Sequence, residues 1–182
     1  MKRLSHGLVV PVLRVRFPLA APSKNLPYGR FFGFDVQCLY MKKGIDYTGV
    51  CVVFYCHDGE GNVLMHRRSN QCRDEHGCWD IGGGGLKHRN QVLDDVRREI
   101  EEEYCTEALE IEHLGYRDVH REHDGEQTHW IALDFKVLID RDKVANGEPH
   151  KLAEIGWFTV DSIPDPMHSQ LGTFFENYKD KL

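Results

Sequence analysis

The sequence predicts an α+β domain in which strands and helices are mixed along the chain, and three observations predict it. An uninterrupted apolar run over residues 48–56 has the pattern of a strand that is buried on both faces. Residues 90–104 carry an apolar stripe at helical spacing. Residues 109–119 and 128–139 alternate between apolar and polar side chains, as half-buried strands do.

The composition is that of one globular domain. The 182 residues are 41% hydrophobic and 10% aromatic, which is enough to build a core. No apolar stretch approaches the roughly 18–20 residues that span a bilayer, so we expect no membrane partner. The net charge of −6 opposes a general affinity for nucleic acid polymers. Six cysteines spread through the chain favour a reducing compartment, and we expect a cytoplasmic protein.

The first 34 residues differ from the rest. They carry six lysines and arginines, several prolines and no acidic residue, so the remainder of the chain holds a net charge of −12. One interpretation is an organelle-targeting segment, and the other is a loosely packed extension of the domain. We therefore expect a basic extension over residues 1–34 and a folded domain over 35–182.

The elements of the first half follow from local patterns. Turn residues at 57–62 separate the run at 48–56 from a second strand at 63–67, which predicts a hairpin. Four consecutive glycines at 82–85 permit backbone conformations closed to other residues and allow a ligand to approach closely. A helix follows over 90–104, for which Asn90 is the predicted cap.

The second half completes the set of elements. The strands at 109–119 and 128–139 flank turn residues at 122–125, and a short strand is predicted at 154–158. Apolar residues recur at helical spacing from Leu171 onward, which predicts a terminal helix with one buried face.

Three carboxylates on the 90–104 helix are the main candidates for chemistry. Glu99, Glu102 and Glu103 are three and four residues apart and share a helix face, while Glu101 points elsewhere. Carboxylates held together repel one another unless cations lie among them, and hard divalent ions prefer oxygen ligands. We expect Mg²⁺ as the cofactor, with Mn²⁺ as the alternative ion.

Neighbouring residues extend this candidate site. Arg98 can fix a glutamate's orientation through charge-assisted hydrogen bonds. Gly84 can offer a backbone carbonyl to a metal, and Gly83 a backbone amide to a phosphate oxygen. The simpler interpretation is a solvated charged helix face beside a flexible turn. The glycine loop directly before the helix favours a site.

This segment resembles the box of the Nudix hydrolase superfamily, Gly-x5-Glu-x7-Arg-Glu-U-x-Glu-Glu-x-Gly-U, in which U is a bulky aliphatic residue. The departures are Asn90 for the first glutamate, Cys105 for the last glycine and Thr106 for the closing aliphatic residue. The resemblance covers roughly residues 46–182. Six of the nine fixed positions match: Gly84, Arg98, Glu99, Ile100, Glu102 and Glu103.

The resemblance implies a fold, an activity and roles. The fold is an α/β/α sandwich with a mixed β-sheet, and the reaction is attack by water on the pyrophosphate link of a nucleoside diphosphate joined to a group X. The substrate is thus a small phosphorylated molecule. By resemblance, Glu99, Glu102 and Arg98 are catalytic, and the metal is held by Gly84, Glu99, Glu102 and Glu103. Glu99 is the first choice of general base, with Glu122, Glu126 and Glu154 as alternatives.

Departures from the box change two of these expectations. Asn90 removes one negative charge near the metal. Cys105 stands just past the helix end, where a left-handed backbone is often needed, so we expect a strained or differently shaped cap there.

Substrate contacts are predicted outside the box. Arg67 and Arg68 end the second strand, where they would clamp phosphates, with a solvated basic turn as the alternative. Glu154 and Gly83 complete the predicted substrate-binding set. The aromatic residues Trp130, Trp157 and Phe158 are candidates for stacking on a base, with core packing as the alternative. His66, Cys72, His76 and Cys78 offer zinc-ligand types without the paired spacing of a structural site, so an incidental polar loop is preferred.

Two other functions stay open at this stage. The residues at 64–69 and 77–80 also resemble the branch of the same fold that contains isopentenyl diphosphate isomerase, although no cysteine lies within residues 81–87, where that chemistry would need one. A module that binds nucleotide or protein without turnover is the second alternative. A homodimer is also left open.

Overall fold

The computed structural model describes residues 30–31, 34–35, 41–123 and 125–182. The chain divides into two units, 1–40 and 41–182. In the first unit, β1 (Arg30–Phe31) pairs antiparallel with β2 (Phe34–Asp35). The basic extension predicted for residues 1–34 falls almost wholly outside the described residues, so its boundary stays a prediction. Within the described part of the chain, no helix is long and apolar enough to cross a membrane.

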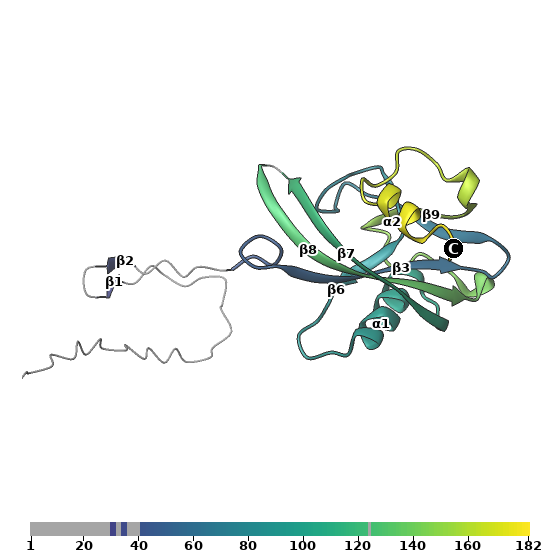
Figure 1. The fold of residues 1–182 in the computed structure, drawn as a ribbon, viewed down its shortest axis with the longest axis horizontal. Helices are drawn as coiled ribbons and strands as arrows, with labels where there is room; N and C mark the ends of the chain where they lie inside the picture. Colours follow the sequence, from purple (N-terminus) through teal and green to yellow (C-terminus); the bar gives the residue numbers. More distant parts are fainter. Residues whose placement is uncertain (1–29, 32–33, 36–40, 124) are drawn as a thin grey trace, which may run out of the picture. The chain divides into compact units, whose positions relative to one another are not determined.

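A mixed sheet forms the centre of the second unit (Figure 1). Its central strand β3 (Gly49–His57) runs parallel to β8 and antiparallel to the glycine strand β6. The turn at 57–62 joins β3 to β4 in the predicted hairpin. The mixed sheet is therefore confirmed. The remaining strands are β4 (Asn62–Arg68), β5 (Trp79–Asp80), β6 (Gly82–Gly85), β7 (Ala108–His123), β8 (Glu126–Ile139) and β9 (Leu152–Thr159).

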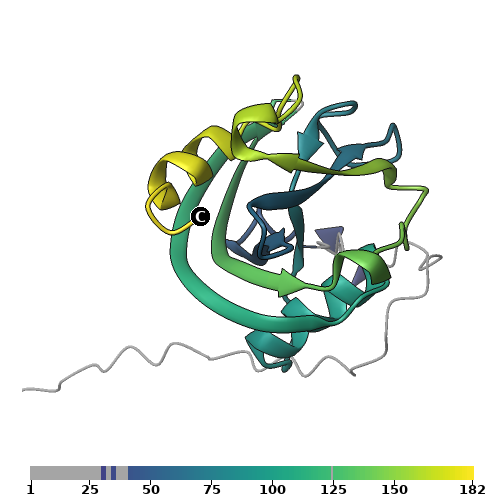
Figure 2. The ribbon, with the colours of Figure 1, turned by 90° about the vertical axis from the view of Figure 1, so that its right-hand side faces the viewer.

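Helices cover both faces of this sheet, on opposite sides in Figures 1 and 2. They are α1 (Val92–Tyr104) and α2 (Leu171–Tyr178). In the described part of the chain, two 3-10 turns add to these helices, at Arg141–Lys143 and Val160–Ser162. The arrangement confirms the predicted sandwich.

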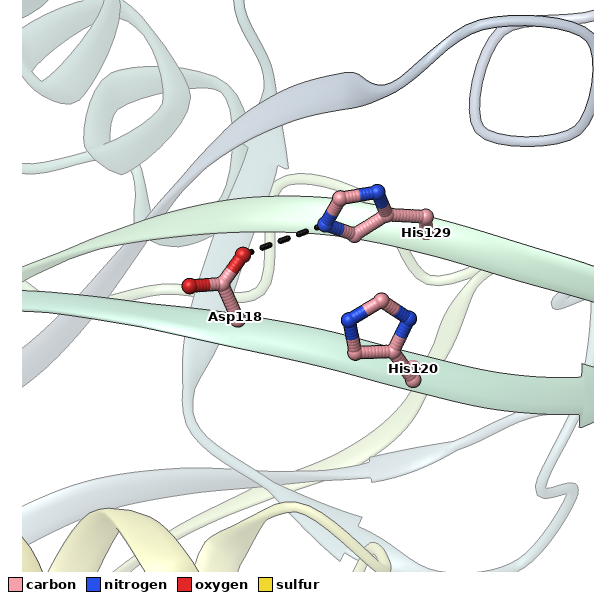
Figure 3. Close-up of side chains that lie close together, drawn as sticks. All are labelled: Asp118, His120 and His129. Atoms are coloured by element: carbon pink, nitrogen blue, oxygen red, sulfur yellow. Dashed lines mark hydrogen bonds and ion pairs between the residues drawn. The ribbon is translucent and has the colours of Figure 1, made fainter.

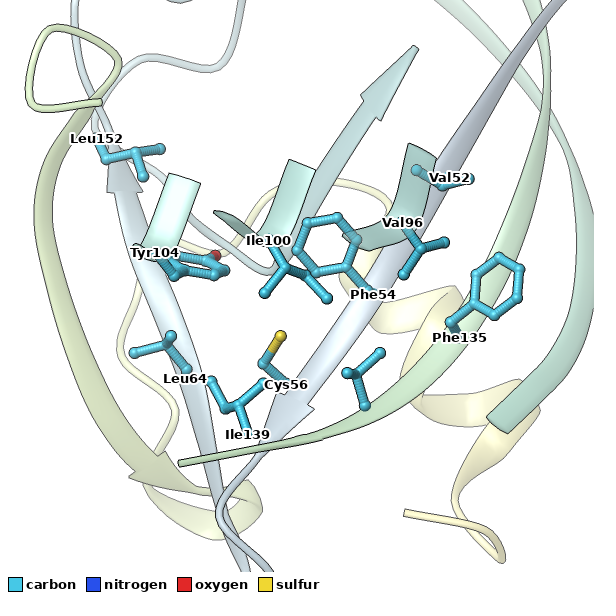
Figure 4. Packing of buried hydrophobic residues seen from close by; sticks show 11 residues of the cluster. Val52, Phe54, Cys56, Leu64, Val96, Ile100, Tyr104, Phe135, Ile139 and Leu152 are labelled. Carbon is cyan, nitrogen blue, oxygen red and sulfur yellow. The ribbon is translucent and has the colours of Figure 1, made fainter. Parts of the chain in front are cut away.

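Alternate residues of β3 point into two separate cores. Val52, Phe54 and Cys56 pack with the apolar face of α1 (Figure 4). Tyr55, from the other face of the strand, packs with Phe174 of α2. Each fully buried side chain of this size contributes about 1.5–3 kcal/mol through removal from water. Burial on both faces, as the apolar run predicted, thus fixes the strand that pairs with the glycine strand β6.

The helix α1 forms because its apolar residues recur every four positions. Val96, Ile100 and Tyr104 are fully buried. The predicted cap at Asn90 is wrong: the N-cap is Gln91, without a side-chain cap bond. The Asn90 side chain instead donates a hydrogen bond to Asp95 Oδ1, at 3.0 Å.

The expectation for Cys105 is confirmed. This residue ends α1 in the left-handed region, with φ 54° and ψ 27°, and its N–H bonds to the carbonyl of Glu101. A side chain is unfavourable in this conformation. The chain nevertheless closes the helix here and turns into β7.

We expect Cys105→Gly to raise the free energy of unfolding by up to about 1 kcal/mol, because glycine adopts the left-handed conformation without steric cost. Urea denaturation would measure the change. Cys105→Ala is the matched control, since it removes the thiol and keeps the strained backbone. Equal stabilities of the Gly and Ala variants would contradict the account.

Candidate active site

The glycine loop and the acidic helix meet at Gly84 and Glu99. Gly84 lies opposite Val52 of the central strand, which fixes its position. A Cβ atom built on Gly84 would lie 2.0 Å from Cδ of Glu99. The carboxylate of Glu99 therefore packs directly on the glycine backbone, and a side chain at position 84 would displace it.

Glu103 lies one helical turn further, with its side chain buried at 6% exposure. Among the described residues, no group forms a hydrogen bond with its Oε2 atom. Burial, followed by the nearby carboxylate of Glu99, raises the pKa of Glu103 well above its usual value, while the backbone N–H of Gly83 opposes that rise. Glu103 therefore presents a buried acceptor oxygen without a hydrogen-bond partner among the described residues.

Arg98 joins the other two carboxylates of the box. Its Nη2 atom donates to Oε1 of Glu99 at 2.7 Å, and its Nη1 atom donates to Oε2 of Glu102 at 2.8 Å. Burial raises the pKa of Glu99, and the bond from Arg98 works against the rise. Glu102 is exposed and turns toward Arg98 and Lys87. The three glutamates share a helix face as predicted, but Glu102 lies at its outer edge.

Asp95 is a fully buried carboxylate in contact with Arg98 that was not predicted from the sequence. Burial would raise its pKa, but hydrogen bonds from Asn90, the Lys87 backbone and Arg98 hold the pKa of Asp95 below its usual value. Both Nε and Nη2 of Arg98 donate to Oδ1 of Asp95, at 3.0 and 2.8 Å. Asn90, at the position of the first box glutamate, thus contacts Asp95.

A cavity of about 480 Å³ opens in front of Glu99 and Glu103. Its lining includes the glycine strand β6 and residues of β7 and β8, among them Trp130. The cavity is rich in cationic side chains, which suits a phosphorylated ligand. These are Arg68, Arg73, Arg117, Arg121 and Lys151.

The predicted substrate-binding residues separate into two groups. Arg68 and Gly83 line the cavity. The guanidinium of Arg68 is held by Asp74 at 2.9 Å and by Asp80 at 3.2 Å. Arg67 and Glu154 are not among the lining residues, and they pair with each other on the exposed surface, with 3.2 Å between Nε and Oε2.

The other candidates also separate. Of the three aromatic residues, only Trp130 lines the cavity, whereas Trp157 and Phe158 pack against the two cores. The alternative bases Glu122 and Glu126 bond to Gln127 and Lys42 outside the cavity.

The four zinc-type candidates do not share a centre. His66 Nδ1 lies 2.8 Å from the Tyr104 hydroxyl, while His76 Nε2 contacts the carbonyl of Cys72. Within residues 41–123 and 125–182, one group of three metal-ligand side chains (His, Cys, Asp or Glu) has donor atoms within 4.8 Å of one another. This group lies elsewhere, on β7 and β8.

Lys151 is a cavity residue that the sequence did not reveal. Burial lowers its pKa, but this is outweighed by Glu148, Glu103 and Glu99, which raise it. Its Nζ atom lies 2.8 Å from Oε1 of Glu148. Only the pairing of β9 with β4, which sets Leu152 opposite Arg68, brings this lysine to the site.

Cys51 also lines the cavity, and it lies opposite Gly85 in the sheet. A thiol therefore reaches the glycine loop from β3, although the sequence has none within residues 81–87. Burial, followed by the charge of Asp134, raises the pKa of Cys51 to about 11. The group is a neutral thiol near neutral pH and is not a nucleophile.

Comparisons with known proteins agree with this geometry. The model of the NUDIX domain matches residues 47–178. A MutT NUDIX hydrolase from Burkholderia pseudomallei has 26% identity and a TM-score of 0.64, over 72% of this chain and 98% of that one. The MutT protein from Methanosarcina mazei Go1 has 23% identity and a TM-score of 0.62, over 74% and 94% of the two chains.

A more distant likeness is to a bifunctional NMN adenylyltransferase/ADP ribose pyrophosphatase from Francisella tularensis. Its identity is 13% and its TM-score 0.58, over 74% of this chain and 41% of that one, so it bears on the fold alone. A search of curated protein sequences found no significant match.

Proposed function

The chain belongs to the NUDIX domain family and is a Nudix pyrophosphohydrolase, and we propose that its cavity cleaves nucleoside diphosphates linked to a group X, in a reaction that depends on a divalent cation. The observation that carries the proposal is the contact of Glu99 with Gly84 beside the buried carboxyl of Glu103. Nucleoside triphosphates are the first substrates to test, because the family's substrates share the pyrophosphate link.

The residues present fit a divalent cation. Glu103 has a buried oxygen without a hydrogen-bond partner among the described residues, and Glu99 lies on the same helix face. These oxygens, with the Gly84 carbonyl and the outer carboxylate of Glu102, are the ligand type that Mg²⁺ and Mn²⁺ prefer. When bound, such an ion neutralises charge on phosphate oxygens and lowers the pKa of water. We propose Mg²⁺ as the physiological ion.

Glu99 is the proposed general base. Its carboxylate lies in the cavity, and Arg98 holds it through the 2.7 Å bond to Oε1. In the proposed step the oxygen of a water molecule forms a bond to phosphorus, the bridging P–O bond breaks, and Glu99 accepts the proton of the water. The alternatives Glu122, Glu126 and Glu154 do not line the cavity, which favours Glu99.

The cationic wall is proposed to bind the phosphates. Lys151 is the main candidate, because it interacts with the carboxylates of Glu99 and Glu103 and its side chain is half exposed. Arg68 and the backbone of Gly83 line the same space. Trp130 also lines the cavity, where its ring would contact the base or the group X.

The test is turnover of a panel of nucleoside triphosphates and nucleoside diphosphate derivatives in ¹⁸O water with Mg²⁺. We expect two phosphorylated products, one of which carries a single ¹⁸O atom, because water opens the pyrophosphate bond. Absence of turnover on every member would contradict the proposal and favour a binding module. Isopentenyl diphosphate is tested beside this panel, and its rearrangement without phosphate cleavage would instead favour the isomerase.

We expect Lys151→Gln to raise KM by about 10- to 100-fold with a smaller change in kcat, because a charge-assisted hydrogen bond to phosphate contributes about 1.5–3 kcal/mol. Steady-state kinetics on the best panel substrate would measure it. Lys143→Gln is the matched control, since Lys143 is exposed and pairs with Asp140 away from the cavity. An unchanged KM in Lys151→Gln would remove this lysine from the phosphate site.

A further inference from the structure

A second group of metal-ligand side chains lies on the ribbon of β7 and β8. In this antiparallel pair, His120 lies directly opposite His129, and Asp118 precedes His120 by two residues. Residues two apart on a strand project from the same face, so all three side chains come together. One donor atom of each lies within 4.8 Å of those of the other two (Figure 3).

This group faces away from the cavity. Arg117, Val119 and Arg121 line the cavity, and they alternate along β7 with Asp118 and His120. On β8, Trp130 lines the cavity while its neighbour His129 belongs to the group. The three side chains thus project from the face of the ribbon opposite to the one that lines the cavity, and they share no residue with the proposed catalytic metal site on α1 and β6.

The chemistry of the three side chains differs from that of the carboxylates in the cavity. Two imidazoles and one carboxylate are the ligand set that suits Zn²⁺ and related transition-metal ions, whereas Mg²⁺ prefers oxygen ligands alone. Asp118 and His129 are partly exposed, with 55% and 38% of their side-chain surface accessible, so water can complete the coordination.

The histidine rings are held by neighbouring groups. The two rings stack with 4.2 Å between centroids and 17° between planes. His129 Nδ1 lies 3.1 Å from Oγ1 of Thr48, and its Nε2 lies 3.1 Å from Oδ1 of Asp118. In the tautomer whose Nδ1–H donates to Thr48, Nε2 carries no proton and its lone pair is available to an ion shared with Asp118. The bond from Nδ1–H to Thr48 is then of the kind that typically orients a metal-ligating histidine.

We propose that Asp118, His120 and His129 form a binding site for one transition-metal dication of the Zn²⁺ type, separate from the catalytic cation. The ion would join β7 to β8 near the turn between them and stabilise the end of the ribbon whose other face carries Arg121 and Trp130. The site is independent of the proposed hydrolysis, because none of its residues lines the cavity.

The experiment is equilibrium dialysis of the full chain against Zn²⁺ in excess Mg²⁺, followed by metal analysis. His120→Gln removes one ligand, and His113→Gln is the matched control because His113 is an exposed histidine of the same strand. We expect the wild type and His113→Gln to bind one more equivalent of Zn²⁺ than His120→Gln. Equal zinc content of wild type and His120→Gln would overturn the proposal.

A thermal measurement provides the second readout. Zn²⁺ that binds only the folded state raises Tm by mass action, so it should raise Tm of the wild type and His113→Gln more than that of His120→Gln. Asp118→Asn should behave as His120→Gln does, since it removes the anionic ligand with little change of shape. The same Zn²⁺-dependent rise in all four proteins would exclude this site. Hydrolysis in Mg²⁺ is expected to be equal in all four, which keeps the two proposals distinguishable.

Discussion

Glu99→Gln is expected to lower kcat by about 10²–10⁴-fold, which is the usual contribution of a positioned general base. The glutamine keeps the shape that packs against Gly84 but cannot accept the proton of water. It also removes one anionic ligand from the cation, so the concentration of Mg²⁺ needed for half-maximal rate should rise. Steady-state kinetics over a Mg²⁺ titration would measure both effects.

The control for this variant is Glu101→Gln, on the same helix. Glu101 is exposed and lies outside the cavity lining, so the substitution changes the charge by the same amount without touching the site. Wild-type kcat is expected for Glu101→Gln. Equal activities of the two glutamine variants would show that Glu99 has no special role.

The second large effect is expected for Arg98→Gln, which should lower the free energy of unfolding by about 3–5 kcal/mol. The guanidinium donates two hydrogen bonds to Asp95, whose side chain is fully buried. Without Arg98, that carboxylate is left as a buried charge with only the Asn90 amide and the Lys87 N–H as donors. Glu99 and Glu102 also lose the contact that orients them, so activity should fall as well.

Urea denaturation would measure this loss, with Arg97→Gln as the matched control because Arg97 is exposed on the same helix. Asp95→Asn in the Arg98→Gln background should recover part of the stability, since it removes the unpaired charge.

The stability difference between wild type and Arg98→Gln should also depend on pH. The pKa of Asp95 is depressed in the wild type, so its stabilisation is present above the ordinary aspartate pKa of about 4 and is lost on acidification. The difference in the free energy of unfolding between wild type and Arg98→Gln should therefore become smaller as the pH falls. A difference below about 1 kcal/mol at neutral pH would contradict the account.

The parts of the fold that the sequence predicted correctly depend on local spacing. The apolar run of β3 and the four-residue recurrence of Val96 and Ile100 identify buried faces without knowledge of partners. The same holds for the glutamates of the box, since spacing alone puts Glu99 and Glu103 on one helix face. The cap was missed because Asn90 had a stronger partner: a buried carboxylate attracts an amide donor more than the helix end does.

The parts that could not be predicted depend on contacts between distant segments. Lys151 reaches the cavity through the pairing of β9 with β4, and Trp130 through the parallel pairing of β8 with β3. Nothing in the sequence near either residue specifies those registers. The strands β7 and β8 also extend beyond the predicted ranges, because backbone pairing continues where side chains no longer alternate. That extension brings His120 opposite His129.

The central claim is that Glu99 and Glu103 hold a divalent cation against the glycine loop. Anomalous diffraction from crystals grown with Mn²⁺ tests it most directly, since the signal locates the ion without assuming its ligands. The account predicts a peak within coordination distance of both carboxylates, on the cavity side of Gly84. The absence of an anomalous peak there, in a crystal saturated with Mn²⁺, would contradict the claim.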